Sequence, residues 1–216
     1  MNKLEDLLQA RPQNDIWWGK QVHRRARPAV ATGNPRLDGL LAGGGWPVGA
    51  LSELLTTATG SGAMSLLAPA LATLSRQQRR WIALIAPPFQ PCAAAFVELD
   101  IDLKRLLIVH PRDREQHAWA LEQALRAGAC GAVLAWPDDK LDNTRLRRLQ
   151  LAAREGKSCG FLIRPRSCMT QSSPAAVRIA LRASPRGVHI EVIKRQGGWP
   201  VEGFESVLPK TRTPTH

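Results

Sequence analysis

The sequence predicts an α/β protein with a mainly parallel sheet flanked by helices, a C-terminal antiparallel hairpin and flexible ends. Three observations predict this fold class. Short apolar runs alternate with helical patterns of about ten residues or more, as in βαβ units. Several of these runs are apolar throughout, which is typical of strands covered on both faces. Two segments near the C-terminus instead alternate apolar with polar residues, which is typical of a hairpin with one face in water.

The amino-terminal part of the core is predicted from its glycines and its first apolar runs. Gly33–Gly49 is rich in glycine and predicts a turn region. Ala50–Leu55 is a short apolar run and predicts a buried strand. Apolar residues at helical spacing follow over Ala63–Gln78, and Trp81–Ala86 predicts the next strand. Together these elements form the first strand–loop–helix–strand unit.

Helices and strands continue to alternate towards the C-terminus. Two of the helical patterns are each followed by a glycine, Gly128 or Gly156, which favours a helix end. Val177–Ala183 and Val188–Ile193 flank a Ser-Pro-Arg-Gly turn and form the predicted hairpin. The remaining elements are helices over Ala93–Leu99, Glu115–Ala127 and Asn143–Glu155, and strands over Leu106–Val109, Gly131–Trp136 and Gly160–Arg164.

The chain of 216 residues is predicted to form one domain with two extensions. Residues 1–28 are expected to be a helix and a basic linker, residues 29–196 the core, and residues 197–216 a flexible arm. Apolar residues in both extensions are candidate contacts for a partner: Leu4, Leu7, Leu8, Trp17, Trp18, Trp199 and Phe204. The sequence has neither a secretory signal nor a membrane-length apolar run, so we expect a cytoplasmic protein.

The segment that follows the first strand stands where a phosphate-binding loop would lie. Such a loop needs the pattern G-x-x-x-x-G-K-[ST], in which backbone N–H groups and a lysine hold the phosphates. Here Ala63 occupies the lysine position, and the opening glycine is replaced. The remnant of the loop consists of Thr56, Thr57, Gly60, Gly62 and Ala63. We therefore predict neither tight ATP binding nor ATPase activity.

The other groups that carry enzyme chemistry are also missing from the sequence. The strand ending at Trp136 is followed by Pro137, where an NTPase of this kind would present a metal-binding aspartate. The four cysteines and five histidines have no metal-ligand spacing and form no nucleophile motif. We therefore expect no enzyme activity, no metal and no cofactor.

Positive charge is concentrated in one quarter of the chain. The formal net charge is +12, and twelve Lys or Arg face two acids between Arg145 and Arg195. Such clustering favours a polyanionic partner such as DNA, although a merely solvated arginine-rich face gives the same pattern. The candidate DNA contacts are Arg145, Arg147, Arg148, Arg154, Lys157, Arg164, Arg166, Lys194 and Arg195.

Several motifs together resemble a known family. The run Leu37–Gly49, the degenerate loop and Ala120–Trp136 are similar to the RecA core, and the span from Ile16 to about Pro200 resembles ImuA, a RecA-like family of bacterial translesion-synthesis cassettes. The resemblance implies a non-catalytic accessory factor induced in the SOS response. It implies the partners ImuB (a Y-family polymerase homologue), the error-prone DnaE-type polymerase, RecA and, indirectly, the sliding clamp. RecA-like cores often assemble through an N-terminal segment, so residues 4–18 could serve self-association or a mixed filament instead of ImuB.

Two other functions fit parts of the sequence. Glu155–Pro165 is similar in both ImuA and the related SulA division inhibitors, so the chain could inhibit division by binding FtsZ. In that case Arg145–Arg166 would meet an acidic protein surface. The longer glycine-rich entry and tail favour ImuA. The third possibility is an ATPase with an unorthodox loop, in which the hydroxyl groups of Thr56, Thr57, Thr59 and Ser61 would contact phosphate.

Overall fold

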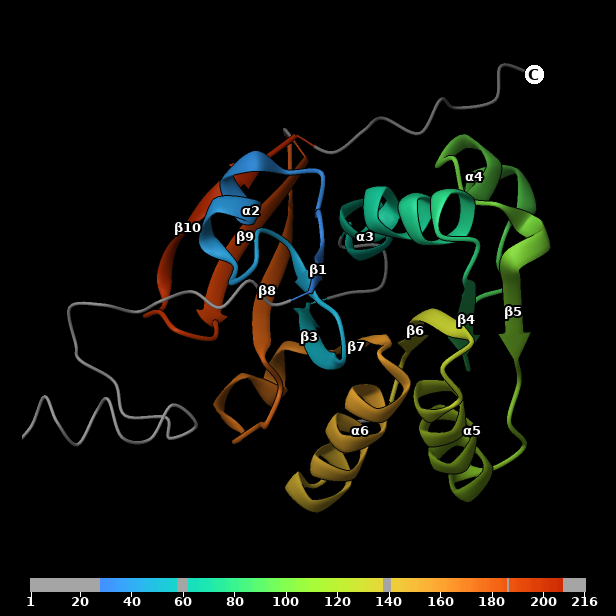
Figure 1. Ribbon diagram of the computed structural model, residues 1–216. Helices are drawn as coiled ribbons and strands as arrows, with labels where there is room; N and C mark the ends of the chain where they lie inside the picture. The colour runs from blue at the N-terminus through green and yellow to red at the C-terminus, as the bar shows by residue number, and fades with distance from the viewer. Residues whose placement is uncertain (1–27, 58–61, 138–140, 186, 208–216) are drawn as a thin grey trace, which may run out of the picture.

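The computed structural model describes residues 28–57, 62–137, 141–185 and 187–207. Within these residues the main sheet has eight strands (Figure 1). The strands from β8 to β5 are parallel, and β9 and β10 are antiparallel, so the sheet is mixed. From edge to edge the strands are β10 (Val201–Ser206), β9 (Gly187–Lys194), β8 (Val177–Ser184), β3 (Ala50–Thr56), β7 (Cys159–Pro165), β6 (Cys130–Ala135), β4 (Trp81–Ile85) and β5 (Leu106–Val109).

Helices cover both faces of this sheet. Helices α5 (Arg114–Arg126) and α6 (Asn143–Gly156) lie side by side on one face, and α3 (Ala63–Ala72) lies on the other (Figure 1). A π-helical turn, Thr73–Gln77, extends α3. The short elements are α2 (Pro35–Leu40), α4 (Ala93–Glu98), the 3-10 turns Leu103–Arg105 and Arg166–Thr170, and the two-stranded pair β1 (Ala29–Val30) and β2 (Trp46–Pro47). The predicted α/β class, with helices flanking the sheet and a C-terminal antiparallel hairpin, is confirmed.

The core consists of two apolar layers, because successive side chains of a strand point to opposite faces. Leu54, Leu134 and Phe161 point towards α3 and pack in one cluster with the buried leucines of that helix. Leu162, which follows Phe161 on β7, points to the opposite face and packs with Leu125 of α5 and Leu149 of α6. The uninterrupted apolar runs in the sequence arise from this burial on both faces.

The ends of α6 are set by specific residues. Asp142 is the N-cap, and its carboxylate accepts a hydrogen bond of 2.7 Å from the Arg145 N–H. At the other end Lys157 adopts a left-handed conformation with φ of 49°. Gly156 is needed for close packing, because a Cβ there would lie 2.0 Å from the Leu125 carbonyl oxygen of α5. The expected helix stop at Gly156 therefore marks the contact between two helices.

The C-terminal part of the core is more ordered than the sequence indicated. Residues 197–216 were expected to form a flexible arm, but Val201–Ser206 is strand β10, which pairs with β9. Phe204 is buried in the cluster on the α3 side of the sheet. The Arg36 guanidinium lies over its ring, with Arg36 Cζ 4.3 Å from the centroid of the Phe204 ring. Its prediction as an exposed partner contact is therefore wrong. Trp199, in contrast, is 86% exposed.

Candidate functional site

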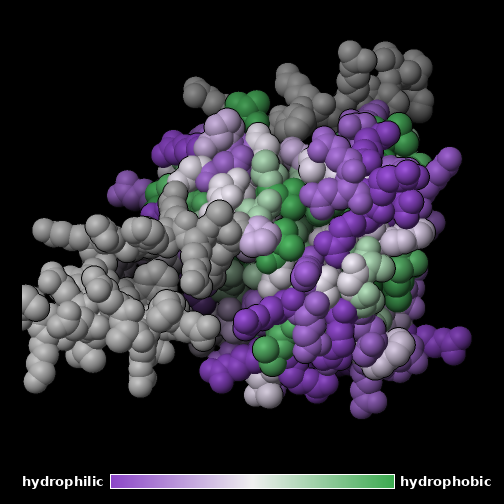
Figure 2. Space-filling view, in the orientation of Figure 1, coloured by the Kyte–Doolittle hydropathy of each residue, from purple (hydrophilic) through white to green (hydrophobic). Residues whose placement is uncertain are grey.

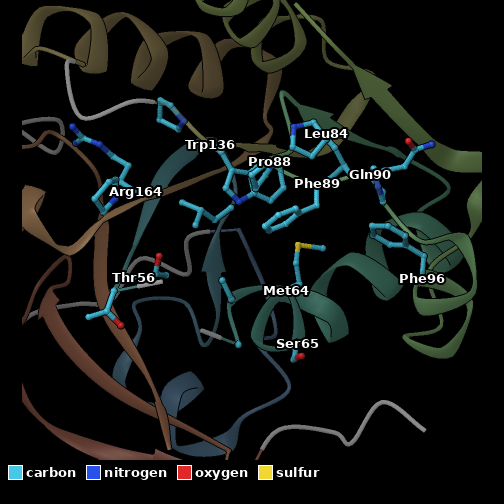
Figure 3. Close-up of a pocket in the computed structure, with 18 residues that line it drawn as sticks. Thr56, Met64, Ser65, Leu84, Pro88, Phe89, Gln90, Phe96, Trp136 and Arg164 are labelled. Carbon is cyan, nitrogen blue, oxygen red and sulfur yellow. The ribbon is translucent and has the colours of Figure 1, made fainter. Parts of the chain in front are cut away.

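A pocket of about 640 Å³ lies at the carboxyl ends of the parallel strands (Figure 3). Thr56 and Thr57 reach it from the end of β3, and Gly62 and Ala63 reach it from the start of α3. This is where open α/β sheets bind ligands. Four of the five predicted loop residues thus line one cavity, and the fifth, Gly60, lies outside the described residues.

The lining of this pocket is mainly apolar. Met64, Phe89 and Phe96 face the cavity from three different segments (Figure 3). The proline lining matters because proline has no backbone N–H to donate to a phosphate. The only charged side chain among the described lining residues is that of Arg164, and its guanidinium is already bound to Glu53. The prolines are Pro87, Pro88, Pro91, Pro137 and Pro165.

A buried ionic cluster lies beside the pocket, centred on Glu53 of β3. The Glu53 carboxylate accepts hydrogen bonds from Arg164 Nη1 at 3.2 Å and from Arg178 Nε at 2.6 Å. Ser173 Oγ donates a third hydrogen bond, at 2.8 Å. The side chains of Glu53 and Arg164 are both 0% exposed. Arg164 therefore cannot contact DNA from this position, and its prediction as a DNA contact is wrong.

The same cluster fastens the chain between β7 and β8 to the sheet. Arg178 donates to the carbonyl oxygens of Cys168 at 2.8 Å and Met169 at 3.2 Å. Lys194 Nζ donates to the Ser173 carbonyl oxygen at 2.7 Å, and burial, together with the nearby charge of Arg178, lowers the pKa of Lys194. Lys194, which the sequence analysis named as a candidate DNA contact, thus holds the chain before β8 in place. Glu53 was missed by sequence analysis, although one acid inside an apolar strand indicates a buried ion pair.

Helix α6 carries the exposed part of the predicted cationic region. Arg145, Arg147, Arg148 and Arg154 are all exposed, as is Lys157 after the helix. Arg148 pairs with Glu122 of α5 at 2.8 Å. Arg147, Leu151 and Arg154 are spaced so that they share one outward face, and Leu151 is 56% exposed. We call these three residues the α6 stripe; within the described residues no ion pair involves either of its arginines.

The remaining predicted cations lie elsewhere and have other partners. Arg166 pairs with Glu191 of β9 at 3.0 Å. Arg195 donates to the carbonyl oxygens of Leu40 at 2.7 Å and Trp199 at 2.9 Å. The nine predicted cations therefore do not form one continuous surface. The predicted partner contacts Leu4, Leu7, Leu8, Trp17 and Trp18 lie outside the described residues.

The described residues contain no group of three or more His, Cys, Asp or Glu side chains placed to hold a metal ion. Over the same residues, no helix has the length and apolar character needed to cross a membrane.

The fold and the site define a class: an α/β protein that has a mainly apolar pocket at the carboxyl ends of its parallel strands. A family model described as "Cell division inhibitor SulA" matches residues 49–160, which run from the start of β3 into β7. The chain is 30% identical to a cell division inhibitor SulA of Edwardsiella piscicida, over 57% of this chain and 73% of that protein. The chain belongs to the SulA family.

Other relatives carry the same description. Cell division inhibitor SulA of Pectobacterium atrosepticum is 29% identical over 66% of this chain and 75% of its own length. The Pseudomonas aeruginosa protein of that name is 30% identical over 53% of this chain and 71% of its own length.

These matches correct the resemblance to ImuA. They overturn the predicted role in translesion synthesis and the predicted partners ImuB, DnaE-type polymerase, RecA, sliding clamp and DNA. The residues of Glu155–Pro165 are similar in both families and could not distinguish them. The choice of ImuA was based on the length of the glycine-rich segment and of the tail, and these lengths do not identify the family. Loop and terminal lengths vary among relatives more than the packed core does.

Proposed function

We propose that this chain is a SulA-like cell division inhibitor that binds FtsZ and acts by contact. The observation that carries the proposal is the family match over residues 49–160, which covers the parallel centre of the sheet and helices α3 to α6. The cytoplasm is the proposed location, because the division protein FtsZ assembles there.

The pocket supports a mode of action without catalysis. Phosphoryl transfer depends on a lysine, a metal-binding acid and closely placed backbone N–H groups. Ala63 stands where the lysine would be, and prolines line the cavity. We propose that the core is a RecA-like scaffold whose nucleotide site has lost these groups. Support for this comes from the strand–loop–helix unit of β3 and α3 and the parallel strands beside it.

A direct test measures GTP hydrolysis by purified FtsZ as increasing amounts of this protein are added. We expect the hydrolysis rate to fall and to reach its minimum near one molecule of inhibitor per FtsZ, because an inhibitor that acts by contact must stay bound to each FtsZ molecule that it inhibits. An unchanged rate at excess inhibitor, with a folded protein by circular dichroism, would contradict the proposal. A second test adds ATP and magnesium and measures the Tm of the protein. A ligand present at a hundred times its Kd adds about 2.7 kcal/mol to the free energy of unfolding, so an unchanged Tm is expected of a protein that does not bind ATP.

A further inference from the structure

Strand β5 forms one edge of the sheet and is exposed on both faces. It pairs with β4 in parallel register from Leu106 opposite Ile82 to Val109 opposite Ile85, and within the described residues no strand pairs with its outer side. Leu107 is 44% exposed and Ile108 is 38% exposed. Consecutive side chains of a strand point to opposite faces, so each face of β5 has one exposed apolar side chain, while Leu106 and Val109 pack against the core. Parallel strands are normally covered on both faces.

The apolar centre of this edge is flanked by positive charge. Lys104 and Arg105 precede the strand, and Arg112 follows it. From 102 to 114 there are four Lys or Arg and two acids, Asp102 and Asp113. The Asp102 carboxylate caps the turn before the strand by accepting from the Lys104 N–H, and the Asp113 carboxylate caps α5 by accepting from the Gln116 N–H. Figure 2 shows hydrophobic side chains at the right-hand edge of the view, where Figure 1 places β5, with hydrophilic side chains around them.

These charges disfavour pairing between two copies of β5. A symmetric antiparallel pair centred between Leu107 and Ile108 would place Arg112 opposite Leu103 of the other copy. It would also bring Arg112 close to Lys104 of that copy. Like charges placed opposite one another weaken a strand pair, and charged residues at an edge are a common protection against self-association. A segment that carries acids at the same positions would instead be attracted.

The geometry points to β5 as a docking edge for an extended segment of a protein partner, with an apolar centre and acidic residues on both sides. The partner's backbone would pair with the free N–H and C=O groups of β5, as in other cases of strand addition. Its apolar side chains would cover Leu107 and Ile108, and its acids would face Lys104 and Arg112. This surface is distinct from the α6 stripe, because α5 and α6 cover the sheet on one face while β5 is its edge.

The test is a selection of random peptides on the immobilised full-length chain, followed by fluorescence anisotropy with the enriched peptides. We expect enrichment of an apolar centre flanked by Asp or Glu, and slower hydrogen exchange at residues 106–109 when peptide is bound. The double variant Lys104→Glu, Arg112→Glu should bind the enriched peptides about tenfold more weakly or worse. The charge-matched control is Arg79→Glu, Arg182→Glu, whose two arginines are exposed in the turn before β4 and on β8; this variant should bind normally.

Several outcomes would overturn the inference. One is the absence of acidic enrichment; another is binding that is equally weakened in both double variants. Protection from exchange at another segment would place the docking site elsewhere. Dimers detected by sedimentation, and lost on changing Leu107 to Ser, would identify a second copy as the occupant.

Discussion

Glu53 is the residue on which the buried charges depend. It pairs with both Arg164 and Arg178, and no other acid among the described residues forms an ion pair with either arginine. In Glu53→Gln the amide cannot neutralise two buried guanidinium groups. Removing one partner of a buried ion pair costs about 3–5 kcal/mol, and we expect a loss in the free energy of unfolding of that order, measured by urea denaturation. Glu98→Gln, at an exposed position, is the matched control, and an equal effect of the two changes would contradict the role of the cluster.

The four cysteines differ in burial, so we expect them to differ in reactivity. Burial raises the pKa of Cys159 to about 12 and also raises the pKa of Cys130, while Cys168 is buried and Cys92 is exposed. A raised pKa keeps a thiol protonated at pH 8, and the thiolate is the form that reacts. We expect iodoacetamide at pH 8 to label Cys92 alone in the native protein, and all four cysteines after unfolding. Mass spectrometry of peptides reads the result, and rapid native labelling of Cys159 would contradict this burial.

At the scale of elements, the contact between α5 and α6 depends on one glycine. A Cβ at Gly156 would meet the Leu125 carbonyl oxygen at 2.0 Å and Arg126 backbone atoms at 2.9 Å. Backbone atoms cannot move aside as a flexible side chain can, so Gly156→Ala must push the helices apart. Overpacking of this kind costs about 1–3 kcal/mol, which thermal denaturation would detect as a lower Tm. Gly39→Ala is the control, because a Cβ there meets nothing within 4 Å; similar Tm changes for both variants would contradict the packing argument.

At the scale of the whole molecule, local patterns predicted the sheet and helices, but long-range contacts decided which charges are exposed. The apolar runs of β3, β6 and β7 and the periodicity of α6 are local properties, and each is found close to its predicted range. Arg164 and Arg147 look alike in sequence, yet one is buried against Glu53, 111 positions earlier in the chain, and the other is exposed. Strand β10 escaped prediction because its glycine and weak alternation are compensated by pairing with β9. Burial and pairing of this kind depend on the complete fold.

A contact surface is a property of the assembled molecule, and the α6 stripe is our candidate surface for the proposed inhibition of FtsZ. The stripe joins an exposed leucine to two arginines without acidic partners in the described residues, which suits an acidic protein surface with an apolar contact at its centre. In Arg147→Glu, Arg154→Glu both attractions become repulsions. We expect about tenfold more of this variant to be needed for half inhibition of FtsZ GTP hydrolysis, and less salt dependence in its binding, since the attraction of the wild type is screened by ions.

Two controls make this expectation specific to the stripe. Arg79→Glu, Arg182→Glu changes the net charge by the same amount and should inhibit like the wild type, because a general charge effect would act on both pairs equally. Leu151→Ser removes the apolar contact alone and should weaken inhibition without changing its salt dependence. Wild-type inhibition by the α6 double variant would place the FtsZ contact on another surface while leaving the function of the protein intact. The salt dependence, the charge reversal and the leucine change thus separate the electrostatic from the apolar contribution of one helix face.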